Sequence, residues 1–150
     1  MKFKFPLQKV LDHRKIKEDL AQKDFHDVLN ELQILQKKLQ ELEVALHEAH
    51  VRSGSLQSQG GTQGPALSQI NEFQKNQKIL IQLQKTKILA QEKVVEGKRE
   101  LLLQAAVETK TINKFKEKKF NEYREEREAD EQKEMDEQNI LRFKPFSKRE

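Results

Sequence analysis

A run of positions spaced alternately three and four residues apart dominates the first third of the chain. Ten of its twelve positions are apolar, and the two polar ones, Arg14 and Glu18, are neighbours near the N-terminal end. This spacing is the a/d pattern of a coiled coil, whose apolar stripe needs a partner helix of matching length. The positions are Leu11, Arg14, Glu18, Ala21, Phe25, Val28, Leu32, Leu35, Leu39, Leu42, Leu46 and Ala49.

A second helix-forming stretch follows an uncharged break in which no residue from Ser53 to Ile70 carries a charge. Four glycines and Pro65 fall within twelve residues of this break, a composition that predicts a loop. We therefore predict an all-α protein, a long two-helix antiparallel coiled-coil hairpin with an overhanging C-terminal helix. Its predicted parts, within one coiled-coil rod over 1–150, are a helix over about 6–51, a flexible loop over about 53–65, a helix over about 66–142 and a basic tail over 143–150.

The apolar phasing of the second helix is looser than that of the first. One heptad register contains Leu80, Leu83, Ala90, Val94 and Leu101, with Lys87 and Gly97 as interruptions, before the stripe slips to Ala105, Ile112 and Phe115. If the chain folds at residue 59 or 60, residue i meets residue 119 − i, which predicts the apolar pairs Leu39–Leu80, Phe25–Val94 and Leu7–Ile112. Beyond about Lys116 the second helix is expected to have nothing of its own chain to pack on. A long intermolecular coiled coil is the alternative that this pattern leaves open.

The composition argues against a large hydrophobic core. Hydrophobic residues make up 35% of the 150 residues and charged residues 36%, whereas globular domains have about 45–50% and about 25%. The chain has no cysteine, which excludes disulfides and thiolate metal sites. No run of eighteen apolar residues and no signal-peptide pattern occurs, so we predict no direct membrane insertion.

Charge is distributed in blocks along the second half of the chain. Residues 71–120 carry 12 basic and 6 acidic groups, residues 121–139 carry 3 basic and 9 acidic groups, and residues 140–150 carry 4 basic and 1 acidic group. Such blocks favour oriented docking against a charged partner, although a solvated helix face is an equal alternative.

The sequence contains no motif that is typical of an enzyme active site. Gly60–Gly64 has no following Gly-Lys-Ser/Thr, so it is interpreted as a turn and not as a phosphate-binding loop. Glu43, His47 and His50 share a helix face but have no enclosing shell, so no metal site is predicted. We predict no enzymatic activity, no cofactor and no nucleic-acid partner, since the basic stretch lacks an aromatic platform.

The two ends of the chain resemble the flagellar export protein FliJ family. The N-terminal resemblance rests on Phe5–Lys15 followed by Lys17 and Glu18, and the C-terminal one on Glu131–Glu137 followed by Arg142 and Phe143. The resemblance covers essentially the whole chain. The loop from Ser53 to Gly64 is richer in Gly, Gln and Ser than the family pattern.

This resemblance implies a cytoplasmic stalk, peripheral to the inner-membrane flagellar type III export apparatus. Family members are coiled coils similar to the stalk of the ATP synthase γ subunit. The implied partners are the hexameric export ATPase, whose centre the stalk engages and whose ring assembly it promotes, the cytoplasmic domain of the export gate, and export chaperones. A generic structural coiled-coil scaffold and an injectisome stalk protein are the alternatives.

The resemblance also implies two sets of site residues. Positions expected to bind the ATPase are Leu7, Leu11, Arg14, Lys15, Glu18, Ile112, Phe115, Glu131, Glu134, Asp136, Arg142 and Phe143. Positions expected to bind the export gate are Phe73, Gln77, Leu80 and Gln84, which share one stripe, although Phe73 and Leu80 are alternatively expected to face the first helix. The polar seam residues Arg14 and Glu18 either serve a partner or set the register of the two helices.

Overall fold

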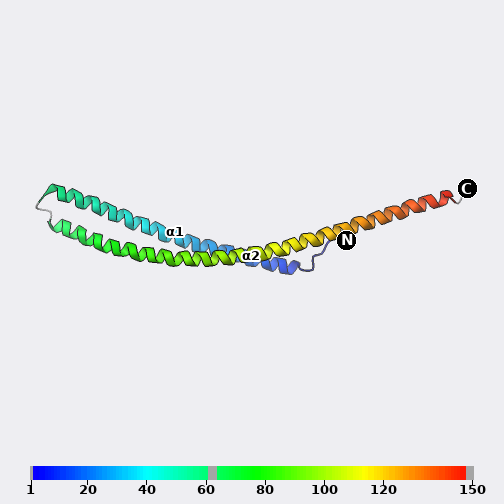
Figure 1. Cartoon of the computed structure of the whole chain (residues 1–150), viewed down its shortest axis with the longest axis horizontal. Helices are drawn as coiled ribbons and strands as arrows, with labels where there is room; N and C mark the ends of the chain where they lie inside the picture. Colours follow the sequence, from blue (N-terminus) through cyan, green and yellow to red (C-terminus); the bar gives the residue numbers. More distant parts are fainter. Residues whose placement is uncertain (1, 61–63, 148–150) are drawn as a thin grey trace. The chain divides into compact units, whose positions relative to one another are not determined.

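Two long helices make up the chain in a computed structural model that describes residues 2–60 and 64–147, with side chains described through residue 143. Helix α1 spans Gln8–Gln59 and helix α2 spans Gly64–Ser147. The two helices run antiparallel along each other, with α2 continuing past the start of α1 (Figure 1). The predicted all-α hairpin is thus confirmed, and the described residues contain no strand.

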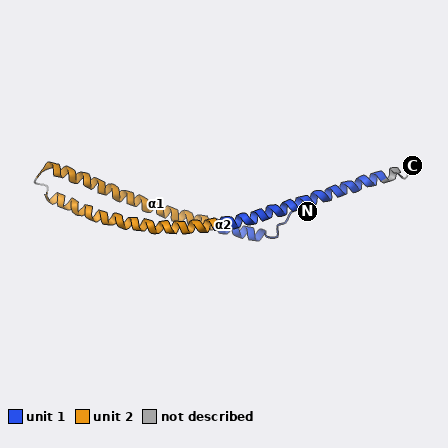
Figure 2. Cartoon of the chain, in the orientation of Figure 1, with its two compact units in different colours: residues 1–18, 104–150 blue, residues 19–103 orange. Residues whose placement is uncertain are grey.

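The helices divide into two compact units, coloured separately in Figure 2. Unit 1 consists of residues 1–18 and 104–150, and unit 2 consists of residues 19–103. Unit 2 is a two-helix coiled coil that includes the hairpin end. Unit 1 holds both termini, and in it the start of α1 packs against a middle portion of α2.

The seam predicted for the first helix is confirmed at all of its positions. Each of the twelve is buried or half-buried, and Leu11 is completely enclosed. The same spacing continues beyond the predicted end of the helix to Ser53, which is buried, and Leu56, which is half-buried. The apolar stripe of α1 therefore faces α2 along the whole helix.

The seam predicted for the second helix is confirmed at Ala105 and Ile112 but is wrong by one residue over 80–101. Leu80, Leu83, Val94 and Leu101 are between 45% and 56% exposed. The residues that face α1 lie one position further along, and they keep the alternating three-four spacing of a coiled coil. They are Ile70, Gln74, Gln77, Ile81, Gln84, Ile88, Gln91, Val95, Lys98, Leu102, Ala105, Thr109, Ile112 and Lys116.

Three glutamines explain this shift of the seam. The Nε2 atoms of Gln77, Gln84 and Gln91, spaced one heptad apart, donate to main-chain carbonyl oxygens of α1. The acceptors are Leu42 at 3.0 Å, Leu35 at 2.9 Å and Val28 at 3.0 Å, respectively. A helical carbonyl has a second lone pair, so it can accept this bond without losing its own helical hydrogen bond. Polar side chains can therefore occupy a seam that an apolar pattern alone would assign elsewhere.

The same hydrogen bonds establish how the two helices align along their length. The pairs Val28–Gln91, Leu35–Gln84 and Leu42–Gln77 are the pairs that a fold at residue 59 or 60 requires. The axial alignment predicted for unit 2 is thus confirmed, whereas the rotation of α2 about its own axis was predicted wrongly.

The hairpin end is more helical than predicted. Helix α1 continues to Gln59 instead of ending near residue 51, and α2 begins at Gly64 instead of near residue 66. Gly54 is the only glycine between Arg52 and Gln59, and the inward positions of Ser53 and Leu56 hold this stretch against α2. Gly60 follows α1 with a φ of 84°, the left-handed conformation that commonly ends a helix. Residues 61–63 of the predicted loop lie outside the described residues.

The two ends of the chain also depart from the predicted boundaries. Helix α1 begins at Gln8, and residues 2–7, named here the N-terminal strap, precede it as a non-helical segment. Helix α2 continues to Ser147, past the predicted end near residue 142. The rest of the predicted basic tail, residues 148–150, lies outside the described residues.

Candidate functional site

An ion cluster joins the two helices within unit 1. The carboxylate of Glu108 on α2 forms an ion pair with Arg14, and its Oε2 atom lies 3.5 Å from the Lys17 Nζ. The hydrogen bond from the Arg14 guanidinium holds the pKa of the Glu108 carboxyl below its ordinary value, helped by the positive charges of Arg14 and Lys17 and opposed by burial. Next to this cluster, the Thr109 hydroxyl donates to the Arg14 carbonyl at 3.2 Å. The polar seam residue Arg14 therefore contributes directly to interhelix pairing.

Aromatic rings attach the N-terminal strap to α2. The Phe3 ring lies 5.4 Å from that of Phe120, centre to centre, and 5.5 Å from that of Tyr123. The buried Phe5 ring lies 5.9 Å from that of Phe115. These separations are typical of favourable ring pairs. The prediction that α2 has no intramolecular contact beyond about Lys116 is therefore wrong, because the strap covers it as far as Tyr123.

A basic surface lies at the start of α1. Lys9, Val10, His13, Arg14 and Lys17 line a shallow groove of about 440 Å³. Lys15 is exposed nearby, and Lys116 of α2 donates to the Gln8 side chain at 2.8 Å. A concave surface lined by cations favours binding of an acidic segment.

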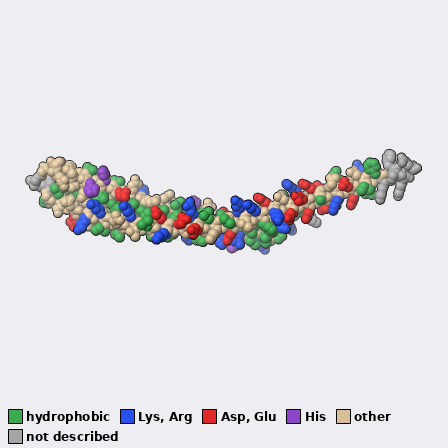
Figure 3. Space-filling model, viewed as in Figure 1, with side chains coloured by type: hydrophobic (Ala, Val, Ile, Leu, Met, Phe, Trp, Pro, Cys, Tyr) green, Lys and Arg blue, Asp and Glu red, His purple; other side chains and the backbone are tan. Residues whose placement is uncertain are grey.

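An acidic surface covers the C-terminal part of α2. Every described side chain from residue 124 to residue 143 is exposed, and charged side chains of both signs cover the visible face of this part (Figure 3). Two ion pairs within the helix, Arg124–Glu128 and Arg127–Glu131, satisfy only part of its charge. The charge excess of residues 121–139 is therefore open to solvent.

The residues predicted to bind the ATPase occupy different environments in unit 1. Leu11 is fully buried, so it supports the fold and has no surface to offer a partner. The half-buried members are Arg14, Glu18 and Ile112, and Phe115 contacts the strap. The exposed members also include Leu7, Lys15, Glu131, Glu134, Asp136, Arg142 and Phe143.

The residues predicted to bind the export gate separate into two pairs. Gln77 and Gln84 are buried and donate to α1, so their amides are already engaged. Phe73 and Leu80 are 44% and 47% exposed and lie beside the seam. The four residues therefore do not form one accessible stripe.

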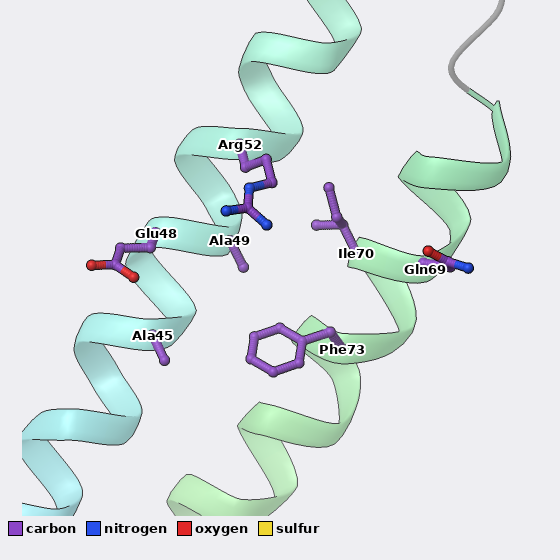
Figure 4. Close-up of a pocket in the computed structure, with 7 residues that line it drawn as sticks. All are labelled: Ala45, Glu48, Ala49, Arg52, Gln69, Ile70 and Phe73. Atoms are coloured by element: carbon purple, nitrogen blue, oxygen red, sulfur yellow. The ribbon is translucent and has the colours of Figure 1, made fainter.

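A groove of about 290 Å³ lies between α1 and α2 next to Phe73. In Figure 4 the Phe73 ring, Ile70 and Ala49 point toward the space between the helices, whereas Glu48 and Gln69 point away from it. Ala45 and Ala49 leave room opposite the ring because their side chains are short. The groove has an apolar floor, with Arg52 and Glu48 on its α1 side.

Sequence reasoning missed three long-range contacts, two between the helices and one between the N-terminal strap and α2. Glu108, Gln91 and the strap residue Phe3 were not singled out, although each joins elements far apart in the chain. The heptad repeat of Gln77, Gln84 and Gln91 is a signal that could have revealed the polar seam. No comparable repeat marks Glu108 or Phe3, because their partners are set by the pairing of the helices.

Neither a metal-binding cluster nor a membrane span occurs among the described residues. No cluster of three or more His, Asp or Glu side chains among them is arranged to hold a metal ion. None of the helices, over the part that the structure describes, combines the length and apolar character that a membrane span needs.

Comparisons with known proteins add a family assignment. The family model described as "Flagellar FliJ protein" matches residues 3–145. A solved structure, that of a putative YscO homologue, CT670, from Chlamydia trachomatis, is 24% identical, with 99% of this chain and 100% of that chain covered and a TM-score of 0.43. No curated protein matches the chain.

Proposed function

Because the chain belongs to the FliJ family of flagellar proteins, we propose that it is a non-enzymatic stalk and adaptor of the flagellar type III export apparatus. In this proposal unit 1 engages the centre of the hexameric export ATPase and promotes assembly of its ring. Unit 2 contacts the cytoplasmic domain of the export gate, and the protein also receives export chaperones. It acts in the cytoplasm, at the membrane-embedded apparatus.

The observation that carries the ATPase proposal is the uncovered, charged C-terminal part of α2. Residues 124–143 form a helix whose described side chains are all exposed, and residues 121–139 have three times as many acidic as basic groups. A single helix that packs on nothing in its own chain gains most of its stability from a partner. The central opening of a ring can supply such a partner on all sides.

Charge in unit 1 supports an oriented mode of insertion. The basic groove at Lys9, His13 and Lys17 belongs to α1, and the acidic excess belongs to α2. Complementary charges on a partner speed the encounter and select one orientation, whereas they add less to the final affinity. The same charges disfavour a reversed insertion, because charges of this protein would then face charges of the same sign on the ATPase ring.

The gate proposal rests on Phe73 and Leu80 alone, since Gln77 and Gln84 serve the seam. The groove beside Phe73 accepts an apolar side chain, with Ala45 and Ala49 as its floor. Pockets of this kind commonly hold the anchor residue of a partner. This narrows the predicted gate-binding set to its two exposed members.

The test is ATP hydrolysis by the cognate export ATPase with and without this protein, together with sedimentation of the mixture. We expect stimulated hydrolysis and a shift to ring-sized particles. The triple variant Glu131→Lys, Glu134→Lys and Asp136→Lys is expected to lose the stimulation. A control with the same change in net charge, Glu43→Lys, Glu72→Lys and Glu92→Lys, alters exposed residues of unit 2 and is expected to keep it. Full stimulation by the first variant would refute the proposed role of the acidic surface.

A further inference from the structure

Helix α2 carries a second set of apolar residues, exposed beside its seam with α1 in unit 2. Leu83, Val94 and Leu101 are 56%, 45% and 53% exposed, and Ala90 between them is also exposed. With Gly97 and the exposed Lys87, which lies between Leu83 and Ala90, they keep the three-four spacing of a coiled-coil seam. We name the residues Leu83, Ala90, Val94, Gly97 and Leu101 the outer stripe.

The outer stripe leaves apolar side chains on the surface, whereas the stripe that α2 turns toward α1 includes polar ones. At the corresponding levels, the inner stripe contains Ile88, Val95 and Leu102 together with Gln84, Gln91 and Lys98, and the glutamines are held by α1 carbonyls. The hairpin thus encloses polar side chains and leaves apolar ones exposed. A regularly spaced apolar stripe left on the surface is the feature that helix-binding surfaces share.

Gly97 supplies an independent observation on the outer stripe. It lies inside α2, where glycine is among the poorest helix formers. A Cβ atom added at Gly97 would meet nothing within 4 Å, so no packing within the described chain requires a glycine there. The missing side chain leaves a gap between Val94 and Leu101 through which a second helix can approach closely, as at other small-residue helix crossings.

Acidic side chains of α1 flank the outer stripe. Glu31 is placed beside α2 by the hydrogen bond that its Oε2 accepts from Gln91 Nε2 at 3.1 Å. Asp24 lies one heptad before Glu31 and Asp27 lies four residues before it, so all three share that side of α1. All three are exposed. A partner that covers the outer stripe therefore meets negative charge on the side of α1.

We propose that the outer stripe is a docking surface for an amphipathic helix of a partner protein. The partner helix places small apolar residues opposite Gly97 and carries Lys or Arg along the flank that faces Asp24, Asp27 and Glu31. This surface lies further along α2 than Phe73 and Leu80, and the inference does not depend on the proposed binding of the ATPase or the gate. A second copy of this chain is disfavoured as the occupant, because the outer stripe of a second copy is itself flanked by acidic groups.

The test uses the full chain and two synthetic four-heptad helical peptides. Both have Leu and Ala on one face, and they differ only in carrying Lys or Glu on the flanks. Binding is measured by fluorescence anisotropy of the labelled peptide. We expect the Lys-flanked peptide to bind at least about tenfold more tightly than the Glu-flanked one. Equal binding of the two peptides would overturn the charge complementarity on which the proposal rests.

The variant Gly97→Ala separates docking from folding, because the two effects have opposite signs. Alanine is a better helix former and has open space here, so the melting temperature is expected to rise. Peptide binding is expected to weaken, and to weaken further with Gly97→Leu. A raised melting temperature with unchanged binding of the Lys-flanked peptide by both variants would overturn the proposal.

Two control measurements locate the binding. The double variant Asp24→Asn and Glu31→Gln is expected to weaken binding of the Lys-flanked peptide, whereas Glu131→Gln with Glu134→Gln is expected to leave it unchanged. Loss of binding only in the second pair would assign the peptide to the acidic C-terminal surface and overturn the proposal. Sedimentation that shows dimers of the chain, abolished by Gly97→Leu, would assign the surface to a second copy and overturn the choice of occupant.

Discussion

The side-chain amide of Gln84 donates a hydrogen bond to the main-chain carbonyl of Leu35, with 2.9 Å between Nε2 and the oxygen. Gln84 is 6% exposed, so its amide is hidden from water, and this hydrogen bond replaces the one that the amide would otherwise make with water. Equivalent bonds from Gln77 and Gln91 lie one heptad away on either side. The three bonds hold α2 in the rotation that places the glutamines inside and the outer stripe outside.

Replacing Gln84 is expected to show how much this bond contributes. Gln84→Ala loses one hydrogen bond and the packing of the side-chain stem, and should lower the free energy of unfolding by about 1–2 kcal/mol. Gln84→Leu places an apolar side chain among apolar neighbours and should cost much less, because no buried amide remains unsatisfied. Urea unfolding followed by circular dichroism measures both. Equal losses in the two variants would contradict the role given to the hydrogen bond.

Gln74 provides the opposite case within the same seam. Its Nε2 atom is buried and has no hydrogen-bond partner among the described residues. Removing such a donor should be favourable, so Gln74→Leu is expected to raise the free energy of unfolding by about 1 kcal/mol or more. For a chain of this size that corresponds to about 2–4 °C in melting temperature. A lower melting temperature for Gln74→Leu would show that the amide has a stabilising partner after all.

The ion cluster at Glu108 predicts a particular dependence of stability on pH. Since hydrogen bonding from Arg14 lowers the pKa of Glu108 in the folded protein, its stabilising contribution is present above the unfolded pKa of about 4.3. That contribution is lost as the pH falls through the lower, folded pKa, where the carboxylate becomes protonated. The difference in melting temperature between the natural protein and Glu108→Gln should therefore be largest at neutral pH and should disappear in acid.

The control for that pH series is Glu92→Gln, which removes an exposed carboxylate of α2 in unit 2. Its melting temperature should follow that of the natural protein across the series. A pH-independent difference for Glu108→Gln would mean that Glu108 acts through packing and not through its charge.

Tyr123 allows the N-terminal strap to be observed directly. The chain has one tyrosine and no tryptophan, and the Phe3 ring lies 5.5 Å from the Tyr123 ring. Phe3→Ala should uncover that ring and increase quenching of tyrosine fluorescence by acrylamide. The melting temperature should change little, because chain ends open locally at low cost. Phe143→Ala, at an exposed position near the other end of the chain, should leave the quenching unchanged.

Variants at Phe73 and Gln77 distinguish an effect on gate binding from an effect on folding. Phe73→Ala should weaken binding of the cytoplasmic domain of the cognate export gate by about tenfold, as expected for an interface anchor. The melting temperature should fall by only a few degrees, since the Phe73 side chain is 44% exposed. The matched control is Gln77, a buried neighbour of Phe73. Gln77→Ala should lower the melting temperature, but gate binding measured well below that temperature should persist. Unchanged gate binding by Phe73→Ala would exclude Phe73 from the interface.

The seam of α1 was predictable because apolar residues occupy almost all of it. The spacing of Leu32, Leu35 and Leu39 is enough to predict that they face a partner helix, and the same spacing predicts the helix itself. The axial pairing was predictable because a chain that folds at residue 59 or 60 brings residue i opposite residue 119 − i. The family resemblance, read from residues near both ends, was likewise visible in the chain and is confirmed by the family model.

Apolar spacing alone did not decide the rotation of α2. Leu83 and Gln84 are adjacent, and hydrophobicity favours turning Leu83 inward. The structure turns Gln84 inward because a carbonyl of α1 satisfies its amide there. That acceptor belongs to the main chain, which every residue carries, so no residue type in α1 signals its presence.

Local patterns along the chain are enough to predict that two helices form, that they pair along α1, and that charge collects at the end of α2. Each of these features depends on residues a few positions apart. Packing of the two helices settles which stripe of α2 is enclosed, that Arg14 meets Glu108, and that the Phe3 ring lies against Tyr123. These depend on distances between side chains far apart in the chain, and such distances exist only after the helices have packed.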